Sequence, residues 1–531
     1  MGINKVAFFF LCPLSVCGQV DRYFVSFKDK GHTPYSVSAP EKFLSSKSIA
    51  RRARENFAVL EEDLPVDTAY VRQVRATGTQ VFFTSRWFNG VLVQTDASTA
   101  SRITTLPFVA GVELVAHGSR LLNGRQSSKS KFQKASAVLA SNQMQLRQIG
   151  VDAMQAAGYH GQGVDVAVFD AGFVGVNQQS AFQSLFTEGR IRSTYNFVKN
   201  ITDVFSDDDH GTEVLSLMAA NGNNYLGGAD QANYYLYETE DVATEYRVEE
   251  YNWAFAAEKA DSAGVDVINS SLGYNTFDDP TMNYTWASLN GEIAISSQAA
   301  RKAVLRGMLV VNSAGNEGGN SWRYVDVPAD AAGVLACGSV DETGARSFFS
   351  SVGPTADGRI KPDVAATGSG AVVVMSSGVV GTNNGTSFSS PLIASLAAGL
   401  RQALPQSSSR EIYFRIVNSG SQADHPDNLL GYGIPNFALA LAWLDFNDEF
   451  VLYPNPIGVD PLKMLFKNVM DQKLTIIVRD LSGRELATIV DTLTWDNNPY
   501  TLDLSALAAG VYFVTVTTPT ASKTQKIVRI N

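Results

Sequence analysis

Three short runs constrain the fold of this chain more than any other feature. They are Val164–Phe169, Val265–Ile268 and Met308–Val311, which are apolar at nearly every position and are each followed by a polar residue. Such runs are typical of strands that are buried on both faces, as in parallel sheets. We therefore predict an α/β domain, a parallel sheet with helices on both faces, whose functional groups lie at the carboxyl edge.

A serine in a small-residue turn is the candidate nucleophile. Ser387 lies in the stretch Gly385–Pro391, at the start of an alanine-rich apolar helix. A serine hydroxyl attacks well only when a base takes its proton and a third group orients that base. His210, which opens a predicted helix, and Asp170, which ends the first apolar run, can supply these groups. The order Asp, His, Ser excludes the orders of α/β-hydrolases and of chymotrypsin.

Each of these residues also has an ordinary structural explanation. An aspartate at a strand end is commonly a turn or cap residue, and a serine at a helix start is commonly an N-cap. Only the combination, in this order and in these elements, favours catalysis over those alternatives.

Together the three segments resemble those of the subtilisin-like serine peptidases, over about residues 137–445. The resemblance implies that Asp170 orients His210, that His210 is the general base and that Ser387 attacks the peptide carbonyl. It also implies that an acyl-enzyme forms and is then released by water.

Two further positions follow from the resemblance. Asn316, shortly after the run Met308–Val311, matches the family's amide donor to the oxyanion, with a simple turn asparagine as the alternative. Glu213 stands where the family usually has a second histidine. This departure affects the expected packing near His210 and not the catalytic assignment.

Substrate-binding residues are predicted after the run Val265–Ile268. In the family, the backbone here pairs with an extended substrate, and a glycine opens the main specificity pocket. By resemblance these residues are Leu272 and Gly273. A buried strand followed by a tight turn is the alternative. The side-chain preference of the pocket does not follow from the sequence.

The length of 531 residues predicts several domains. We expect a signal peptide over 1–18, an α+β module with a basic linker over 19–136, the peptidase domain over 137–446 and a β-sandwich over 447–531. The signal peptide has Lys5 before a short apolar run, too short to span a membrane permanently. A lipoprotein site at Cys17 is disfavoured by the large Val16 before it.

The 19–136 module is basic, with 17 Lys and Arg against 10 Asp and Glu, whereas the chain as a whole carries a net charge of −10. Opposite charges favour docking of the module on the rest of the chain. Strand-like segments flank a predicted helix over Glu41–Arg54, a compact α+β pattern. Its position resembles that of the family's inhibitory propeptide, with Gly118–Ser136 as the processing region. A permanently attached domain is the alternative.

The C-terminal segment has short alternating strands and a hairpin signal at Asp480–Gly483, which predict a small β-sandwich. The motif Tyr453–Pro456 and the final Lys526–Ile530 resemble the C-terminal sorting domain of type IX secretion in Bacteroidetes. The resemblance implies export across the inner and the outer membrane to the medium or the cell surface. A carbohydrate-binding or surface-binding sandwich is the alternative.

Composition limits cofactors and partners. Cys337 is the one cysteine after the leader and fits a buried strand, and the histidines do not support a metal site. No cofactor is required, although the resemblance allows calcium as a structural ion. We expect protein or peptide substrates, the chain's own propeptide as inhibitor and the type IX machinery as partners. The acidic chain shows no nucleic-acid signature and no permanent membrane span.

Two functions remain open at this point. The first is a secreted serine endopeptidase made as a zymogen. The second is a catalytically inactive subtilisin-fold surface adhesin, against which the presence of all three triad residues argues.

Overall fold

The computed structural model describes residues 20–118, 136–137, 141–222, 225–443, 450–458, 461–466, 472–494 and 499–530. The chain forms two compact units, of which the first contains residues up to Pro34 together with Pro65–Gly124. The second contains Tyr35–Leu64 and everything from Arg125 onward. The predicted signal peptide, the lipoprotein alternative at Cys17 and residues 119–135 of the predicted processing region lie outside the described residues.

The first unit is a four-stranded antiparallel sheet with two helices. The sheet order is β2-β3-β1-β4. The elements are β1 (Asp21–Phe27), α2 (Thr68–Ala76), β2 (Gln80–Ser85), β3 (Gly90–Thr95), α3 (Ala97–Ile103) and β4 (Val109–Ala116). Valines from β1, α2 and β3 share one apolar core. The predicted α+β architecture is confirmed.

The predicted helix over Glu41–Arg54 is only partly correct. The α-helix in this stretch is α1 (Ser46–Arg54), preceded by a 3₁₀ turn over Pro40–Lys42. The Ser45 hydroxyl caps α1 by accepting from the backbone N–H of Ser48 at 3.1 Å, which sets the start of the helix. Moreover α1 belongs to the second unit, and the first unit uses α2, a helix that the sequence analysis missed.

The centre of the second unit is a seven-stranded parallel sheet, as predicted. Its order is β14-β13-β12-β11-β6-β10-β7. The strands are β6 (Asp165–Asp170), β7 (Ile191–Asn196), β10 (Asn233–Glu238), β11 (Val267–Ser270), β12 (Leu309–Ser313), β13 (Leu335–Val340) and β14 (Val364–Thr367). The three apolar runs form β6, β11 and β12, which are adjacent, so their carboxyl ends meet at one edge.

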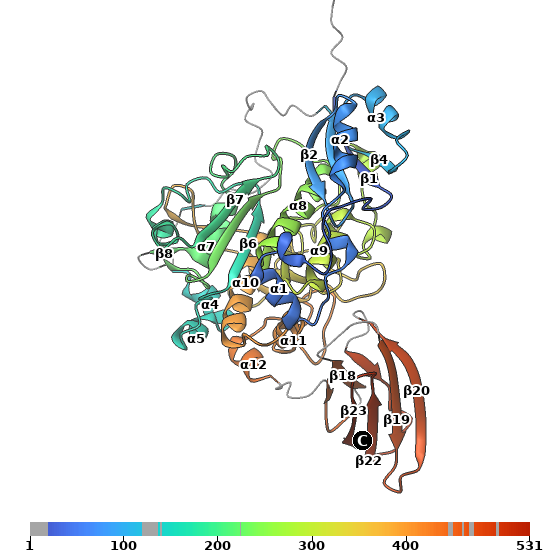
Figure 1. Cartoon of the computed structure of the whole chain (residues 1–531). Coiled ribbons are helices and arrows are strands. Elements are labelled where there is room, and N and C mark those ends of the chain that lie inside the picture. The colour runs from blue at the N-terminus through green and yellow to red at the C-terminus, as the bar shows by residue number, and fades with distance from the viewer. Residues whose placement is uncertain are drawn as a thin grey trace, which may run out of the picture. The chain divides into compact units, whose positions relative to one another are not determined.

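Helices cover both faces of this sheet (Figure 1). Val166 and Val168 of β6 share a core with Leu392 of α10 (Thr386–Ala403). Phe169 instead stacks edge-on against Trp253 of α8 (Val248–Ala263), with ring centroids 5.2 Å apart. Alternating residues of one strand therefore serve opposite helical layers, which is why the run is apolar at almost every position.

The remaining elements of this domain surround the sheet. The other helices are α4 (Gln143–Gln148), α5 (Val151–Ala156), α6 (Gln183–Thr187), α7 (His210–Ala219), α9 (Ile295–Leu305), α11 (Ser409–Asn418) and α12 (Phe437–Ala442). The outer strands are β5 (Ser136–Ala137), β8 (Asn221–Gly222), β9 (Tyr225–Leu226), β15 (Ala371–Val374) and β16 (Val380–Asn383). Cys337 is a free, buried residue of β13, as expected.

The segment 35–64 is joined to the sheet domain by buried ion pairs. Helix α1 lies against α8 (Figure 1). Arg52 binds both carboxylate oxygens of Asp261 at 2.8 Å, and Arg51 pairs with the same carboxylate. Asp63 accepts from Arg306 at 2.6 Å. The side chains of these residues are almost completely buried, so each charge depends on its partner.

The C-terminal segment is a β-sandwich, as predicted. One sheet has the order β17-β18-β21 and the other β20-β19-β22-β23. The strands are β17 (Phe450–Tyr453), β18 (Leu462–Phe466), β19 (Gln472–Arg479), β20 (Glu485–Leu493), β21 (Tyr500–Leu502), β22 (Gly510–Thr517) and β23 (Ser522–Arg529). Both sheets contribute to one apolar core. The predicted hairpin at Asp480–Gly483 connects β19 and β20.

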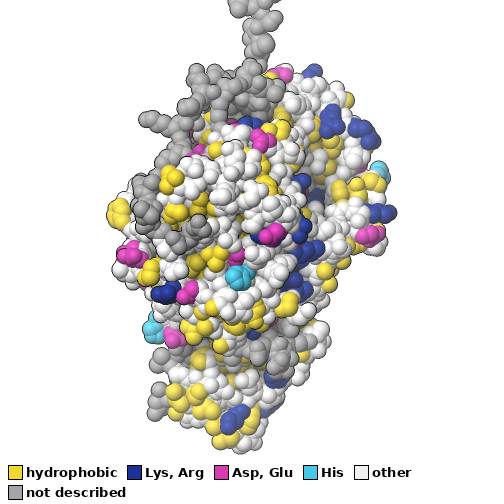
Figure 2. Space-filling view, turned by 90° about the vertical axis from the view of Figure 1, so that its left-hand side faces the viewer, with side chains coloured by type: hydrophobic (Ala, Val, Ile, Leu, Met, Phe, Trp, Pro, Cys, Tyr) yellow, Lys and Arg dark blue, Asp and Glu magenta, His cyan; other side chains and the backbone are white. Residues whose placement is uncertain are grey.

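The surface drawn in Figure 2 mixes hydrophobic side chains with polar and charged ones. Within the described ranges, no helix combines the length and the apolar character that crossing a membrane requires.

The buried pairs generate a stability prediction. In the full chain carrying Ser387→Ala, Asp261→Asn should lower the free energy of unfolding by about 3–5 kcal/mol, because the buried Arg51 loses its carboxylate and Arg52 keeps only its longer contact with Asp63. Guanidinium chloride unfolding, followed by tryptophan fluorescence, measures the change. The control is Asp152→Asn, which removes an exposed pair with Arg147 and should cost at most about 1 kcal/mol. Equal effects of the two substitutions would contradict the prediction.

Candidate active site

The structure brings Asp170 and His210 into direct contact. The Nδ1 atom of His210 lies 2.7 Å from Oδ1 of Asp170. Asp170 is the last residue of β6, and His210 is the first residue of α7. A side chain at Gly211 would come within 2.5 Å of the Gly172 carbonyl oxygen and 2.9 Å of Asp170 Cβ, so only glycine lets α7 approach the strand end this closely.

Carboxylates around His210 set its protonation. Burial lowers the pKa of His210, but the carboxylates of Asp170, Glu213 and Asp208 outweigh burial and hold the pKa above that of a free imidazole. Glu213 is buried in α7 and accepts from the Asn383 amide at 2.7 Å. Glu213, which stands where the family usually has a second histidine, thus helps to raise the pKa of His210.

The acidic run Asp207–Asp209 is held by hydrogen bonds and an ion pair, although three adjacent acids are more typical of a solvated loop. Asp208 is buried and accepts from the backbone N–H of His210 at 2.9 Å. Asp209 accepts from the Ser376 hydroxyl at 2.8 Å, and Asp207 pairs with Lys199 at 2.5 Å. These bonds fix the start of α7 and therefore the position of the histidine.

Ser387 lies in the first turn of α10. This position was predicted from the small-residue stretch Gly385–Pro391. Its hydroxyl donates to the backbone carbonyl of Ser271 at 3.3 Å, and the Ser271 hydroxyl donates to the carbonyl of Ser387 at 2.8 Å. The next residue, Phe388, packs beside the His210 ring, with centroids 5.8 Å apart. Helix α10 therefore holds the serine against the chain that leaves β11, one residue before a side chain that packs beside the histidine ring.

Asn316 is exposed in the loop after β12, and its orientation is fixed. Its Oδ1 atom accepts from the backbone N–H of Thr386 at 2.9 Å and from the Thr386 hydroxyl at 3.1 Å. With Oδ1 held in this way, the amide Nδ2 is the donor that remains for a substrate. Thr386 was not predicted from the sequence, although its position directly before Ser387 could have indicated a role at the site.

Leu272 and Gly273 follow β11 and line a pocket together with Ser387 and Asn316. Their placement brings them to the same sheet edge as the other predicted residues. The carbonyl of Leu272 accepts from the Asn312 amide at 2.9 Å, so it is directed into the protein. Asp326 also lines this pocket and was not predicted, because nothing in its local sequence marks it.

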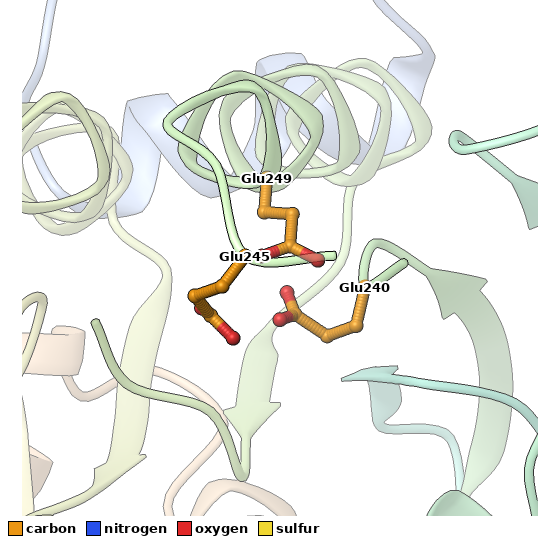
Figure 3. A group of neighbouring side chains, drawn as sticks. All are labelled: Glu240, Glu245 and Glu249. Atoms are coloured by element: carbon orange, nitrogen blue, oxygen red, sulfur yellow. The ribbon is translucent and has the colours of Figure 1, made fainter. Parts of the chain in front are cut away.

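Three carboxylates form the one metal-type cluster found among the described residues. Glu240 follows β10, Glu245 precedes α8 and Glu249 lies in its first turn, and their side chains converge with oxygens within 4.8 Å of one another (Figure 3). Oxygen ligands suit Ca²⁺. However, Glu240 and Glu249 already accept hydrogen bonds from Tyr274 and Asp241. The cluster alone assigns no ion, and calcium remains a prediction from the resemblance.

Comparison with known proteins agrees with this geometry. Residues 161–433 match the Subtilase family, 22–134 the Peptidase S8 propeptide domain of Bacteroidota, and 451–531 the Secretion system C-terminal sorting domain. Subtilisin NAT of Bacillus subtilis subsp. natto is 31% identical over 293 residues, covering 54% of this chain and 68% of that protein.

The chain is similar to further proteins over the peptidase domain. Subtilisin BL of Lederbergia lenta is 29% identical over 294 residues, covering 54% of this chain and 96% of that protein. The crystal structure of MycP1 from the ESX-1 type VII secretion system is 22% identical, with a TM-score of 0.46, over 60% of this chain and 92% of that chain.

The sorting domain indicates export to the medium or the cell surface. With its two flanking domains, the chain belongs to the subtilase family of serine endopeptidases.

Proposed function

We propose that the chain hydrolyses peptide bonds through Ser387, His210 and Asp170. The observation that carries this proposal is the buried 2.7 Å contact between His210 Nδ1 and Asp170 Oδ1, formed beside the helix whose first turn contains the serine. Asp170 holds the imidazole in the tautomer with a proton on Nδ1, so that Nε2 is the nitrogen that accepts the proton of the serine.

In the proposed mechanism, His210 takes the proton of the Ser387 hydroxyl as its oxygen attacks the substrate carbonyl. The developing oxyanion receives a hydrogen bond from Asn316, a donor whose removal costs roughly 100-fold to 1,000-fold in kcat in such sites. His210 then gives its proton to the leaving amine, and the acyl-enzyme is hydrolysed by water, which His210 deprotonates in turn.

We further propose that the chain is made as a zymogen in which the propeptide domain inhibits the site. The match over residues 22–134 supports this assignment. The sorting domain would direct the chain to the type IX machinery and then be removed, and Leu272 and Gly273 would contact the bound substrate beside Ser387.

The nucleophile generates the first prediction for this function. Wild-type enzyme should hydrolyse a protein substrate and become labelled by a fluorophosphonate, whereas Ser387→Ala should do neither, since the reactive oxygen is gone. The control is Ser377→Ala in an exposed turn, which should retain both activities. A matured wild type that neither labels nor cleaves would favour the inactive adhesin.

The carboxylates around His210 predict the pH dependence of activity. The base works only when neutral, so activity is lost as the pH falls through its raised pKa. Glu213→Gln removes one of the charges that raise this pKa and should move the acid limb of kcat/KM to lower pH, by up to about one unit. Glu342→Gln, at an exposed site elsewhere, is the control. If the acid limb of Glu213→Gln stays at the same pH or moves to higher pH, Glu213 does not raise the pKa of His210.

The sorting domain predicts where truncated protein collects. Deletion of residues 448–531 should retain the protein in the periplasm of the producing bacterium, because the signal for passage through the outer membrane is lost. Fractionation and immunoblotting measure this. Full-length Ser387→Ala is the control and should reach the surface, which separates export from activity. Normal delivery of the truncated chain would disprove the sorting role.

A further inference from the structure

A strongly acidic pocket opens beside Ser387. It has a volume of about 400 Å³ and is lined by five carboxylate residues: Glu240, Glu245, Asp278, Glu317 and Asp326. None of the described residues that line it is Lys, Arg or His. Ser387 and Asn316 belong to the same lining. A peptide whose carbonyl lies between these two residues therefore directs the adjoining side chain into the pocket.

Asp326 lies against both loops that form the pocket. Its backbone N–H donates to the Ala314 carbonyl at 3.0 Å, and the following residue accepts from the N–H of Tyr274 at 2.9 Å. A Cβ added at Gly273 would come within 2.7 Å of Asp326 Cβ, and one at Gly315 within 2.3 Å of its Oδ2 atom. Only glycine at these two positions therefore allows Asp326 to approach both loops this closely.

The surroundings of Asp326 suit a cationic ligand. The Asn275 amide donates to its Oδ1 atom at 2.6 Å. Burial, with the added effect of Glu317 and Glu245, raises the pKa of Asp326 to about 8. The uncharged group thus predominates at neutral pH in the empty pocket. A guanidinium or ammonium group entering the pocket would favour the carboxylate and form a charge-assisted hydrogen bond with it.

We propose that this pocket receives an arginine or lysine side chain from the residue whose carbonyl Ser387 attacks, with Asp326 as the specificity-determining residue. The inference rests on the proposed peptidase function. Glu240 and Glu245, drawn with Glu249 in Figure 3, add negative charge to the wall. Apolar or acidic side chains would desolvate these carboxylates without pairing them, which is unfavourable.

The test uses the activated full-chain enzyme, with EDTA present, on internally quenched peptides that differ only in the residue before the scissile bond. Arginine and lysine peptides should exceed phenylalanine and leucine peptides by about tenfold or more in kcat/KM. Asp326→Asn retains an acceptor for Asn275 and should lose most of this preference. Glu317→Gln is a second variant, should Asp326→Asn not fold. Glu342→Gln, exposed outside the pocket, should retain the preference in full.

Fluorophosphonate labelling counts the active sites in each variant and separates the possible failures. A labelled wild type that prefers phenylalanine or leucine overturns the pocket assignment and leaves the peptidase function intact. A wild type that does not label overturns both. A labelled Asp326→Asn enzyme that keeps the full basic preference removes Asp326 from the specificity role.

A pH measurement gives a second readout. The ratio of kcat/KM for the arginine peptide to that for the leucine peptide should rise as the pH rises through about 8, since Asp326 then ionises without help from the substrate. Because hydrolysis of both peptides depends on His210, the titration of His210 cancels in this ratio. The rise should be absent in Asp326→Asn, and a ratio that is flat in the wild type would contradict the assignment.

Discussion

The packing of α10 into the centre of the peptidase domain is the contact on which the site depends. Sixteen of its eighteen residues are buried, from Thr386 to Arg401, and the helix packs on β11, β12, β13, β14 and α7. A helix enclosed on all sides cannot slide or rotate without opening cavities. Its first turn therefore fixes the nucleophile, while Thr386 in the same turn fixes the orientation of Asn316. Helix α10 thus determines both the packing at the centre of the domain and the positions of the groups proposed to act in catalysis.

Buried carboxylates have opposite roles in different parts of the domain. Asp261 is matched by two guanidinium groups and stabilises the structure. Asp170 accepts from a backbone N–H and from an imidazole, a partner that can gain or lose its charge near neutral pH. Asp326 has an amide partner and forms no ion pair with any described residue, so its charge depends on what enters the pocket. The nature of the partner, more than the depth of burial, separates structural from functional acids.

Sequence reasoning succeeded where the signal was local. The strands β6, β11 and β12, the start of α7 at His210 and the first turn of α10 all follow from short contiguous patterns. It failed where the structure depends on contacts between distant segments. Helix α2 was missed, and the pocket residue Asp326 is placed by pairing with the chain near Tyr274 and Ala314. The role of Asp208 in holding the start of α7 could not be predicted, because adjacent acids resemble a solvated loop until their partners are known.

The ion pairs of the segment 35–64 change what maturation must accomplish. This segment lies within the match to the propeptide domain, yet Arg51 and Arg52 neutralise Asp261 inside the peptidase domain. A cut in the linker would break the covalent connection and leave these charges paired, so the severed piece would stay bound. Freeing the enzyme from it requires hydration of at least five buried charges, since Asp63 and Arg306 are paired across the same contact, or digestion of the piece in place. Activation would then be a separate step after cleavage, and it would delay the release of an unrestrained protease.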